Sequence, residues 1–333
     1  GQNTKNTIDC SIYEYGFKDI DGGKTVGTDG LTANQACCAC GGGKNAQPVG
    51  TNSLTADQAC CTCGGGKDIE KLVTMEPNQF KAWQELFTTT GGKTSWTCCA
   101  DKFDDPCGCD DHVVCDENGA ITTLILDSCG IQGELKSELF ASLTSLKKLR
   151  MGENPGLNGT LPGLSLNTNL EHVRFSNNGM SGALPKSWSS LKELNYLSLA
   201  NNQFSGTLPS EWSSMVKLEE FAIFSNQLTG TLPVAWSSMV KLRTLALFSN
   251  QLTGTLPVAW SSMVKLTALA LCYNQLTGTL PPEWSSMSQM TDLRLYTNQL
   301  TGNLPVAWSS MSQLTSLDLH SNQLTGSLPE AWS

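Results

Sequence analysis

The chain has 333 residues, of which 15% are charged, and its formal net charge is −9 at pH 7. No apolar run approaches the roughly 20 residues that cross a bilayer, so a soluble chain without a transmembrane segment is predicted. An acidic balance without a basic patch argues against nucleic acid as a partner. The opening GQNTKNTIDC is polar, as expected of a mature chain whose signal peptide has been removed.

Cysteine is concentrated at the front of the chain. Of the 14 cysteines, 13 lie in residues 1–129, and only Cys272 lies beyond. Residues 1–129 also carry 18 acidic and 9 basic side chains, whereas residues 130–333 carry 12 of each. Dense cysteine in a short segment is typical of proteins exported to an oxidising compartment, so a secreted or surface-anchored protein is predicted. Cys272 is expected to be a free thiol. The disulfide candidates are Cys10, Cys37, Cys38, Cys40, Cys60, Cys61, Cys63, Cys98, Cys99, Cys107, Cys109, Cys115 and Cys129.

Residues 1–67 contain a duplicated cysteine-rich module. GTDGLTANQACCACGGGK (27–44) is followed 23 residues later by GTNSLTADQACCTCGGGK (50–67), with four differences. Adjacent cysteines rarely both bind one tetrahedral ion, so disulfides are favoured over zinc, and neither a metal nor a cofactor is predicted. Seven cysteines cannot all pair within this segment. At least one therefore bridges to the next segment, stays free or pairs with another chain.

Residues 68–120 are predicted to form a separate small unit that covers the start of the repeats. A helix is expected at about Glu76–Thr88, within the run FKAWQELFTTTGGKTSWTCC (80–99). Four cysteines beyond Cys98 then precede the first apolar segment, and the sequence does not fix which of them pair.

Residues 121–333 consist of a 24-residue repeat. FSNQLTGTLPVAWSSMVKL occupies 224–242 and recurs unchanged at 248–266. The pattern is L-x-x-L-x-L-x-x-N-x-L-x-G-x-L-P-x-x-W-S-S-M, and one copy cannot bury its own leucines. The copies are therefore predicted to stack into a solenoid. About nine copies, the last incomplete, begin at Ile121, Leu146, Leu170, Leu194, Leu218, Leu242, Leu266, Met290 and Leu314.

Each recurring letter has a structural interpretation. The alternating L-x-L predicts a short strand with its leucines pointing inward. The asparagine that follows predicts a turn in which the side-chain amide satisfies backbone groups of two coils. The tryptophans recur at one position and are interpreted as a stacked spine on the convex side, with a ligand-binding cage as the alternative. They are Trp188, Trp212, Trp236, Trp260, Trp284, Trp308 and Trp332.

This pattern resembles that of leucine-rich repeat proteins, and its L-x-G-x-L-P segment resembles the plant-type subclass. The LPxxWSSM variant is similar to the repeats of the promastigote surface antigen group of kinetoplastid protists and of related secreted protist proteins. The segment before the repeats resembles the N-terminal cap of plant-type members, although ADKFDDPCGCDD stretches the cysteine spacing. The resemblance implies an α/β repeat solenoid that is curved and capped at its N-terminal end. It also implies a protein that makes contacts outside the cell.

The resemblance places the residues between the strand leucines on the concave face of the solenoid. Copies of the repeat differ from one another at these positions, so recognition of a protein or glycan partner is predicted there. An exposed aromatic stripe of Phe224, Phe248, Tyr273 and Tyr296 is expected, because such stripes are common at interface cores. Incidental surface residues are the alternative. The predicted binding residues are Phe224, Phe248, Cys272, Tyr273, Tyr296, His320, Arg294, Tyr196 and Arg174.

Other functions are less favoured by the sequence than recognition. No nucleophile motif accompanies His112, His172 or His320, so an enzyme is not predicted. Two rows of threonines in the L-T-G-T segments suggest ice binding or O-linked sugars, and an enzyme inhibitor is a further minor alternative. Asn158, in the sequon NGT, is a candidate glycan acceptor.

The end of the chain suggests an assembly. The sequence stops at LPEAWS, in the middle of a repeat. An open solenoid edge is a template for strand pairing, so head-to-tail stacking into an extracellular filament is the leading alternative to recognition.

Overall fold

The computed structural model describes residues 75–109 and 111–332, so the duplicated module predicted at 1–67 lies outside the described residues. The predicted cap helix is observed as α4, Pro77–Thr89, and is followed by α5, Gly92–Ser95, and the 3-10 turn η2, Pro106–Gly108. α4 buries Trp83, Leu86 and Phe87. The buried Gln79 accepts a hydrogen bond from the backbone N–H of Ile121 (2.9 Å), which ties the helix to the first repeat.

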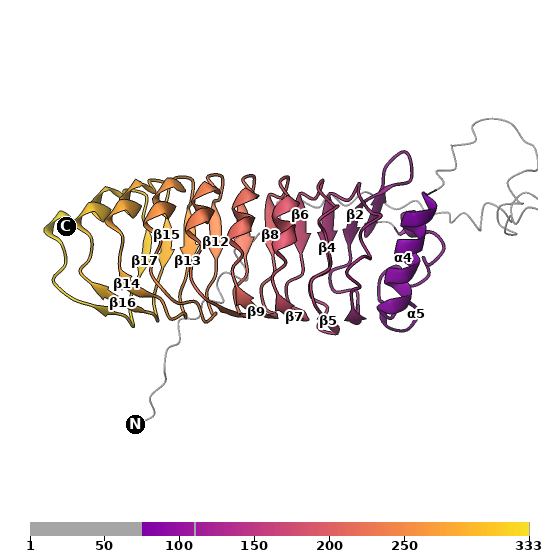
Figure 1. Cartoon of the computed structure of the whole chain (residues 1–333), viewed down its shortest axis with the longest axis horizontal. Helices are drawn as coiled ribbons and strands as arrows, with labels where there is room; N and C mark the ends of the chain where they lie inside the picture. The colour runs from indigo at the N-terminus through magenta and orange to yellow at the C-terminus, as the bar shows by residue number, and fades with distance from the viewer. Residues whose placement is uncertain (1–74, 110, 333) are drawn as a thin grey trace, which may run out of the picture. The chain divides into compact units, whose positions relative to one another are not determined.

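One strand of every repeat joins a long parallel sheet (Figure 1). β1, Val113–Cys115, pairs antiparallel with β2 at one edge, and the remaining neighbours are parallel and in register. In the described residues the order is β1-β2-β4-β6-β8-β10-β12-β13-β15-β17. The strands after β1 are β2 Ile121–Ile125, β4 Lys148–Arg150, β6 His172–Arg174, β8 Tyr196–Ser198, β10 Glu220–Ala222, β12 Thr244–Ala246, β13 Ala268–Ala270, β15 Asp292–Arg294 and β17 Ser316–Asp318.

Most coils then leave this sheet through a second short strand, and the coils from β6 onward also form a 3-10 turn. The second strands form two small parallel sheets, β11-β9-β7-β5-β3 and β14-β16-β18. They are β3 Gly133–Glu134, β5 Leu157–Gly159, β7 Gly179–Ala183, β9 Gln203–Thr207, β11 Gln227–Thr229, β14 Thr277–Thr279, β16 Gln299–Gly302 and β18 Gln323–Leu324. The 3-10 turns are η3 Lys186–Ser190, η4 Ser210–Ser214, η5 Val234–Ser238, η6 Val258–Ser262, η7 Pro282–Ser286, η8 Val306–Ser310 and η9 Glu330–Trp332.

The leucines of all coils merge into one continuous hydrophobic core that also includes the cap. The predicted tryptophan spine is confirmed as part of it. Trp260 is fully buried, lies parallel to Trp236 at 6.4 Å between ring centroids, and donates its indole N–H to the carbonyl of Pro233 in the preceding coil (3.0 Å). Pro257, at φ −70°, starts the 3-10 turn that presents this ring. A ligand cage is excluded for rings packed in this way.

The asparagine of each coil forms a ladder that joins consecutive coils, as the repeat pattern predicts. Asn250 is buried. Its Nδ2 donates to the carbonyls of Ile223 in the preceding coil and Leu247 in its own (both 3.1 Å), and its Oδ1 accepts from the N–H of Leu228 (3.1 Å). The ladder residues with this role are Asn154, Asn178, Asn202, Asn226, Asn250, Asn274, Asn298 and Asn322.

The residue before the ladder asparagine has a left-handed backbone in the described coils, with φ between 51° and 59° from Glu153 to Ser321. Asn177 and Asn201 tolerate this conformation, whereas the β-branched Thr297 (φ 54°) does so poorly. We therefore expect Thr297→Asn to raise the free energy of unfolding by about 1 kcal/mol, measured by denaturant unfolding. The matched control is Thr231→Asn, at a residue whose φ is not positive, which should change stability little. Equal changes in stability at both sites would show that the backbone conformation of Thr297 is not strained.

Candidate recognition surface on the long sheet

The side of the long sheet that points away from the core carries three columns of side chains, called here the sheet face. Two columns come from alternate strand residues and the third from the second residue after each strand. The first is Lys148, His172, Tyr196, Glu220, Thr244, Ala268, Asp292 and Ser316. The second is Arg150, Arg174, Ser198, Ala222, Ala246, Ala270, Arg294 and Asp318. The third is Asp127, Gly152, Ser176, Ala200, Phe224, Phe248, Cys272, Tyr296 and His320.

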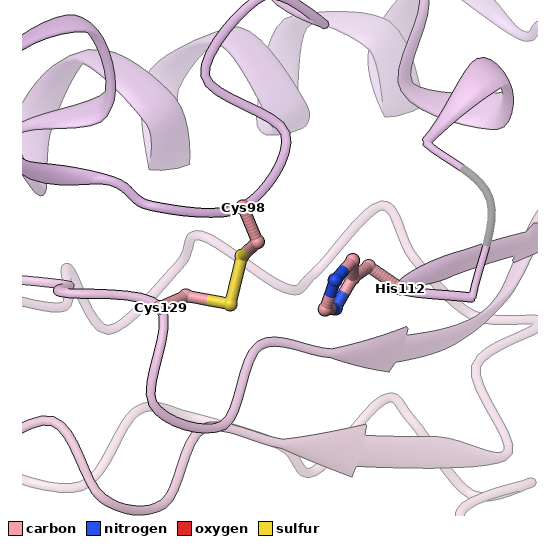
Figure 2. Close-up of side chains that lie close together, drawn as sticks. All are labelled: Cys98, His112 and Cys129. Carbon is pink, nitrogen blue, oxygen red and sulfur yellow. A yellow bond between two sulfur atoms is a disulfide. The ribbon is translucent and has the colours of Figure 1, made fainter.

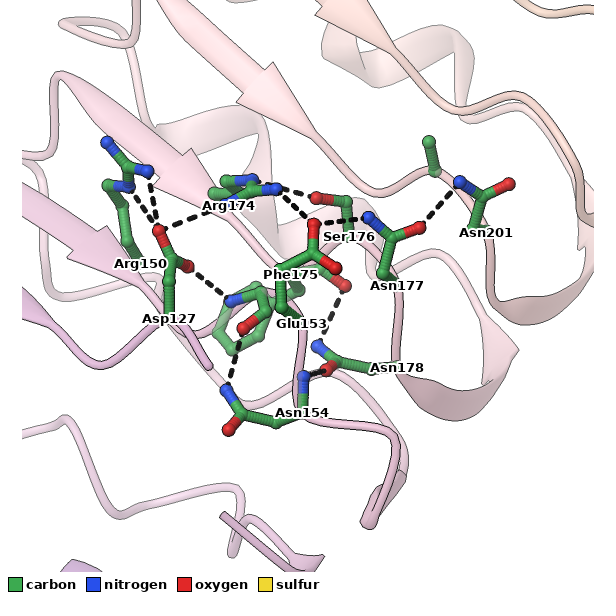
Figure 3. A network of polar contacts seen from close by, with 12 residues as sticks. Asp127, Arg150, Glu153, Asn154, Arg174, Phe175, Ser176, Asn177, Asn178 and Asn201 are labelled. Atoms are coloured by element: carbon green, nitrogen blue, oxygen red, sulfur yellow. Dashed lines mark hydrogen bonds and ion pairs between the residues drawn. The ribbon is translucent and has the colours of Figure 1, made fainter. Parts of the chain in front are cut away.

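A charged cluster occupies the sheet face of the first coils (Figure 3). Asp127 accepts hydrogen bonds from Arg150 Nε (2.6 Å) and from the backbone N–H of Gly152 (2.6 Å), and it forms an ion pair with Arg174 (3.0 Å). The side chains of Asp127, Arg150 and Arg174 are only 13%, 12% and 19% exposed. One carboxylate thus holds two guanidinium groups of the next two coils in fixed positions.

The cluster continues across the coils through polar side chains. Arg174 also donates to Glu153 (2.7 Å), which accepts from Asn177 (2.6 Å), and Asn201 donates to Asn177 in turn (2.6 Å). Burial lowers the pKa of the Arg174 guanidinium, but the neighbouring carboxylates of Asp127 and Glu153 outweigh it, so its pKa lies above the ordinary value. The Arg174 guanidinium therefore stays charged, and the charged cluster presents a fixed set of hydrogen-bond donors and acceptors.

We expect Asp127→Asn to lower the free energy of unfolding by about 2–4 kcal/mol, because two half-buried guanidinium groups lose their shared counter-charge. Denaturant unfolding followed by circular dichroism measures the change. Asp101→Asn, at an exposed cap residue, is the control and should stay within about 0.5 kcal/mol of the wild type. A loss no larger than the control's would show that the cluster does not hold the first coils together.

Aromatic side chains follow the charged cluster along the sheet face. His172 stacks on Tyr196 (4.0 Å between ring centroids), and Phe224 stacks on Phe248 (4.2 Å). Tyr296 lies edge-on to Tyr273 (5.3 Å) and stacks on His320 (4.5 Å). Arg294, beside them, is paired with Asp292 (2.9 Å). The structure therefore brings the predicted binding residues together on one face.

The prediction that the aromatic stripe is exposed is wrong for three of its four members. Phe224, Phe248 and Tyr296 are 5%, 3% and 1% exposed, whereas Tyr273 is half-buried and His320 is exposed. Repeat position indicates which side of a sheet a residue occupies, but not whether that side is covered. The prediction that Cys272 is a free thiol is also wrong, because Cys272 is fully buried and disulfide-bonded.

The cap holds three disulfides, which settle the connectivity that the sequence left open: Cys98–Cys129, Cys99–Cys109 and Cys107–Cys115. His112 lies near the first of these (Figure 2). Two sulfur atoms joined to each other do not supply two thiolate ligands, so this group does not fit a metal site. His112 Nδ1 instead makes a hydrogen bond with the carbonyl oxygen of Ile125 (2.8 Å).

The threonine rows lie on the small sheets, away from the sheet face. Thr253 donates its hydroxyl to the carbonyl of Gly230 in the preceding coil (3.3 Å), as its equivalents do. Gly254 has φ 77°, and a Cβ there would come within 2.7 Å of the Thr231 methyl group, so glycine is needed to keep the rows packed. Exposed members of the rows are Thr207, Thr229, Thr231, Thr255, Thr277, Thr279, Thr301 and Thr325.

The predicted binding residues did not include Glu153, Asn177 or Asn201. These residues share the left-handed position of the coil, which is occupied by serine, threonine or tyrosine in most later coils. Three consecutive coils carry a charged or amide residue at that position, and this run in the sequence could have indicated the cluster.

Comparisons with known proteins agree with this geometry. Residues 264–324 match a leucine-rich repeat family, and residues 169–191 and 193–215 match a second family of the same description. No curated protein matches the sequence. The resemblance to promastigote surface antigens is not confirmed by these matches.

Several solved structures share the fold. The leucine-rich repeat ectodomain of the Arabidopsis thaliana receptor kinase GASSHO1/SCHENGEN3, solved with CASPARIAN STRIP INTEGRITY FACTOR 2, is 33% identical with a TM-score of 0.62, over 65% of this chain and 26% of that one. The Arabidopsis receptor kinase HAESA, solved with the peptide hormone IDA and the co-receptor SERK1, is 26% identical with a TM-score of 0.67. The match covers 77% of this chain and 44% of that one. A plant ice-binding protein is 25% identical with a TM-score of 0.61, and the match covers 77% of this chain and 89% of that one. The chain thus spans less than half the length of these two receptors.

Proposed function

Because the chain is a leucine-rich repeat protein, we propose that it is a non-enzymatic recognition protein that binds an extended polypeptide on its sheet face, outside the cell. The observation that carries this proposal is the contrast between the two sides of the coil. The ladder asparagines and spine tryptophans are copied from coil to coil and carry the fold. The sheet face instead varies from a charged cluster to an aromatic row.

Two further observations support the proposal. Similar structures include receptor ectodomains solved with a peptide hormone. The three cap disulfides fit an oxidising location, and no helix in the described part of the chain is long and apolar enough to span a membrane. A role in adhesion or recognition at the cell surface fits both. A glycan partner stays a prediction.

The proposal is tested by selecting a random peptide library, displayed on phage, on the full chain. A photo-reactive side chain is placed at Tyr273, whose ring contacts Tyr296 at the edge of the sheet face, or at Val258, an exposed residue of η6, as the matched control. We expect selected peptides to cross-link at Tyr273 and not at Val258. Cross-linking at Val258 alone, or equally at both, would place recognition elsewhere.

Ice binding is the second candidate function, and the threonine rows favour it. Exposed threonines repeat at the spacing of adjacent parallel strands, roughly 4.8 Å, and a plant ice-binding protein shares the fold. If the rows bind ice, Thr255→Lys abolishes inhibition of ice recrystallisation, whereas Val258→Lys does not. Equal activity of the two variants would reject the rows as the ice-binding surface.

Two other expectations stay predictions. Asn158 is exposed on β5, where a glycan would meet no obstacle from the core, and removal of N-glycans from native material would reveal it as a loss of mass. Head-to-tail assembly would appear as extended particles in micrographs of the native protein.

A further inference from the structure

Six exposed valines lie in two rows on the side of the coils that carries the 3-10 turns. They are the majority of the exposed large hydrophobic side chains in the described part of the chain. The first row takes its members from the residue that opens the 3-10 turn, and the second row from the residue six positions later. The rows are Val234, Val258 and Val306, and Val216, Val240 and Val264, each between 42% and 62% exposed.

The geometry of the 3-10 turn points both rows outward. Residues three apart eclipse one another in a 3-10 helix. In and directly after η5, the buried Trp236 and Met239 are three apart. Val234, Ser237 and Val240 follow the outer side of the turn at the same spacing. The valines therefore project into solvent, while the tryptophan spine fixes the turn that carries them.

The fold does not require valine at these positions. The other residues found there are Lys186, Ser210, Pro282 and Glu330 in the first row, and Lys192, Ser288 and Ser312 in the second. The coils that carry them form the same 3-10 turn. Apolar side chains that are exposed together without serving the fold are typical of a surface that contacts another molecule.

A row of lysines accompanies the valines in three consecutive coils. The lysines are Lys217, Lys241 and Lys265, each directly after a valine of the second row, and all three are exposed. Lys217 pairs with Glu193 of the preceding coil (2.5 Å). Lys241 and Lys265 form no ion pair with residues 75–109 or 111–332. The valines of these coils are therefore bordered by positive charge that the described residues do not neutralise.

These side chains form one face, called here the valine–lysine face, on the two identical copies of the repeat and the coil before them. Ala235 and Ala259 lie next to its first row, at the position where the neighbouring coils carry Glu211 and Glu283. The face is therefore apolar and cationic in its centre, with acidic residues at its two ends. Its members are Val216, Lys217, Val234, Val240, Lys241, Val258, Val264 and Lys265.

Neighbouring coils lie further apart on this side than on the sheet face. The ring centroids of Trp236 and Trp260 are 6.4 Å apart. Those of Phe224 and Phe248, in the same two coils, are 4.2 Å apart. The coils thus fan out toward the valine–lysine face, which makes that face convex. A convex surface fits a flat partner better than a peptide segment, which binds in grooves or along sheet edges.

We propose that the valine–lysine face docks the protein on an anionic lipid bilayer. Lysines near a bilayer attract acidic headgroups, and exposed apolar side chains enter the boundary between headgroups and acyl chains. Lysine is depleted at protein interfaces, where tyrosine, tryptophan and arginine dominate. The tryptophans of these coils belong to the core, so the composition favours a lipid surface over a protein partner. The face is distinct from the sheet face, and docking does not depend on peptide recognition.

Docking is tested by sedimenting the full chain with lipid vesicles. The probe vesicles contain equal parts of phosphatidylcholine and phosphatidylserine, and vesicles of phosphatidylcholine alone are the comparison. We expect the chain to pellet with the anionic vesicles, to be released by salt, and to bind the neutral vesicles much more weakly. No binding to the anionic vesicles, or equal binding to both kinds, would overturn the proposal.

The contribution of the lysines is measured with residues that the repeat already carries. Lys241→Gln combined with Lys265→Gln introduces the glutamine of the two coils that follow. The pair should lower the partition coefficient about thirtyfold, the equivalent of about 1 kcal/mol for each lysine near the surface. The control, Lys81→Gln combined with Lys147→Gln, removes the same charge from exposed positions in the cap and the first coils and should change binding little. An equal loss in both pairs would overturn the proposal, because binding would then follow net charge alone.

The contribution of the valines is measured in the same way. Val240→Ser combined with Val264→Ser introduces the serine of the two coils that follow. We expect binding to the anionic vesicles to weaken about tenfold, because each substitution removes an exposed apolar side chain from the contact. Unchanged binding would overturn the proposal, because the attraction would then be electrostatic only.

Two other occupants of the face are distinguished by the same variants. If the chain binds poly-L-glutamate but not vesicles, and the lysine pair abolishes that binding, the face belongs to an acidic polypeptide. If the valine pair instead dissociates an oligomer seen by sedimentation equilibrium, the face belongs to a second copy of the chain. Either result without vesicle binding overturns the proposal.

The place of contact is tested with an environment-sensitive fluorescent side chain at Val258 or at Tyr273. Anionic vesicles should shift the emission at Val258 to shorter wavelength and leave the emission at Tyr273 unchanged. A shift at Tyr273 alone would overturn the proposal. Failure of docking leaves peptide recognition intact, because the peptide cross-link at Tyr273 is measured without vesicles.

Discussion

Replacement of a central ladder asparagine, Asn250→Ala, is expected to lower the free energy of unfolding by about 3–5 kcal/mol. The substitution leaves the carbonyls of Ile223 and Leu247 and the N–H of Leu228 without the partner that Asn250 provides. Each buried polar group that loses its partner costs about 1–3 kcal/mol. Denaturant unfolding followed by tryptophan fluorescence measures the loss.

The control for this prediction is Asn195→Ala, at an exposed asparagine between two coils. It should change stability by no more than about 0.5 kcal/mol. A second comparison is Asn322→Ala in the last described coil, where the equivalent amide is only half-buried, so a smaller loss is expected. Equal losses at all three sites would mean that the ladder does not join the coils.

Truncation of a central spine residue, Trp260→Ala, is expected to cost about 3–5 kcal/mol. The substitution leaves a cavity beside Trp236, on which the ring stacks, and removes the donor to the Pro233 carbonyl. In a stack where each coil contacts only its neighbours, loss of a central coil weakens two interfaces. Hydrogen exchange should therefore speed up on both sides of Trp260.

Trp332→Ala in the final described coil tests the same idea at an edge. This ring stacks on Trp308 (6.5 Å) but is only half-buried, whereas Trp260 is fully buried. We expect roughly half the loss seen for Trp260→Ala. An equal loss at both positions would contradict the nearest-neighbour account of the solenoid.

The repeat period predicted the fold because the same physical constraint acts in every coil. Leu245 and Leu247 must point inward, and the turn after them needs an amide at Asn250. The same residue types therefore recur at a fixed spacing in the sequence. The helix α4 could be predicted in the same way, from its apolar spacing and from Pro77 at its first position. Disulfide pairing could not, because it depends on which cysteines the folded cap brings together.

The candidate site was predictable in position but not in environment. The residues between strand leucines are on one face by periodicity, which correctly grouped Phe224, Phe248 and Tyr296. Their burial is not encoded by any local pattern around Phe248, because alternation along a strand indicates the side of the sheet and not the exposure of that side. The disulfide of Cys272 could not be predicted either, because a lone cysteine in the repeats does not indicate a partner. The charged cluster was missed in part because its members come from three different positions of the coil.

The most direct test of the central claim is a variant that changes the sheet face and leaves the copied frame intact. In the double variant, Tyr196→Thr and Tyr273→Ser introduce residues that other coils carry at the same positions, Thr244 and Ser249. We predict an unchanged unfolding midpoint and at least a tenfold weaker binding of the selected peptides, about 1.4 kcal/mol. Undiminished peptide binding by this variant would contradict recognition on the sheet face.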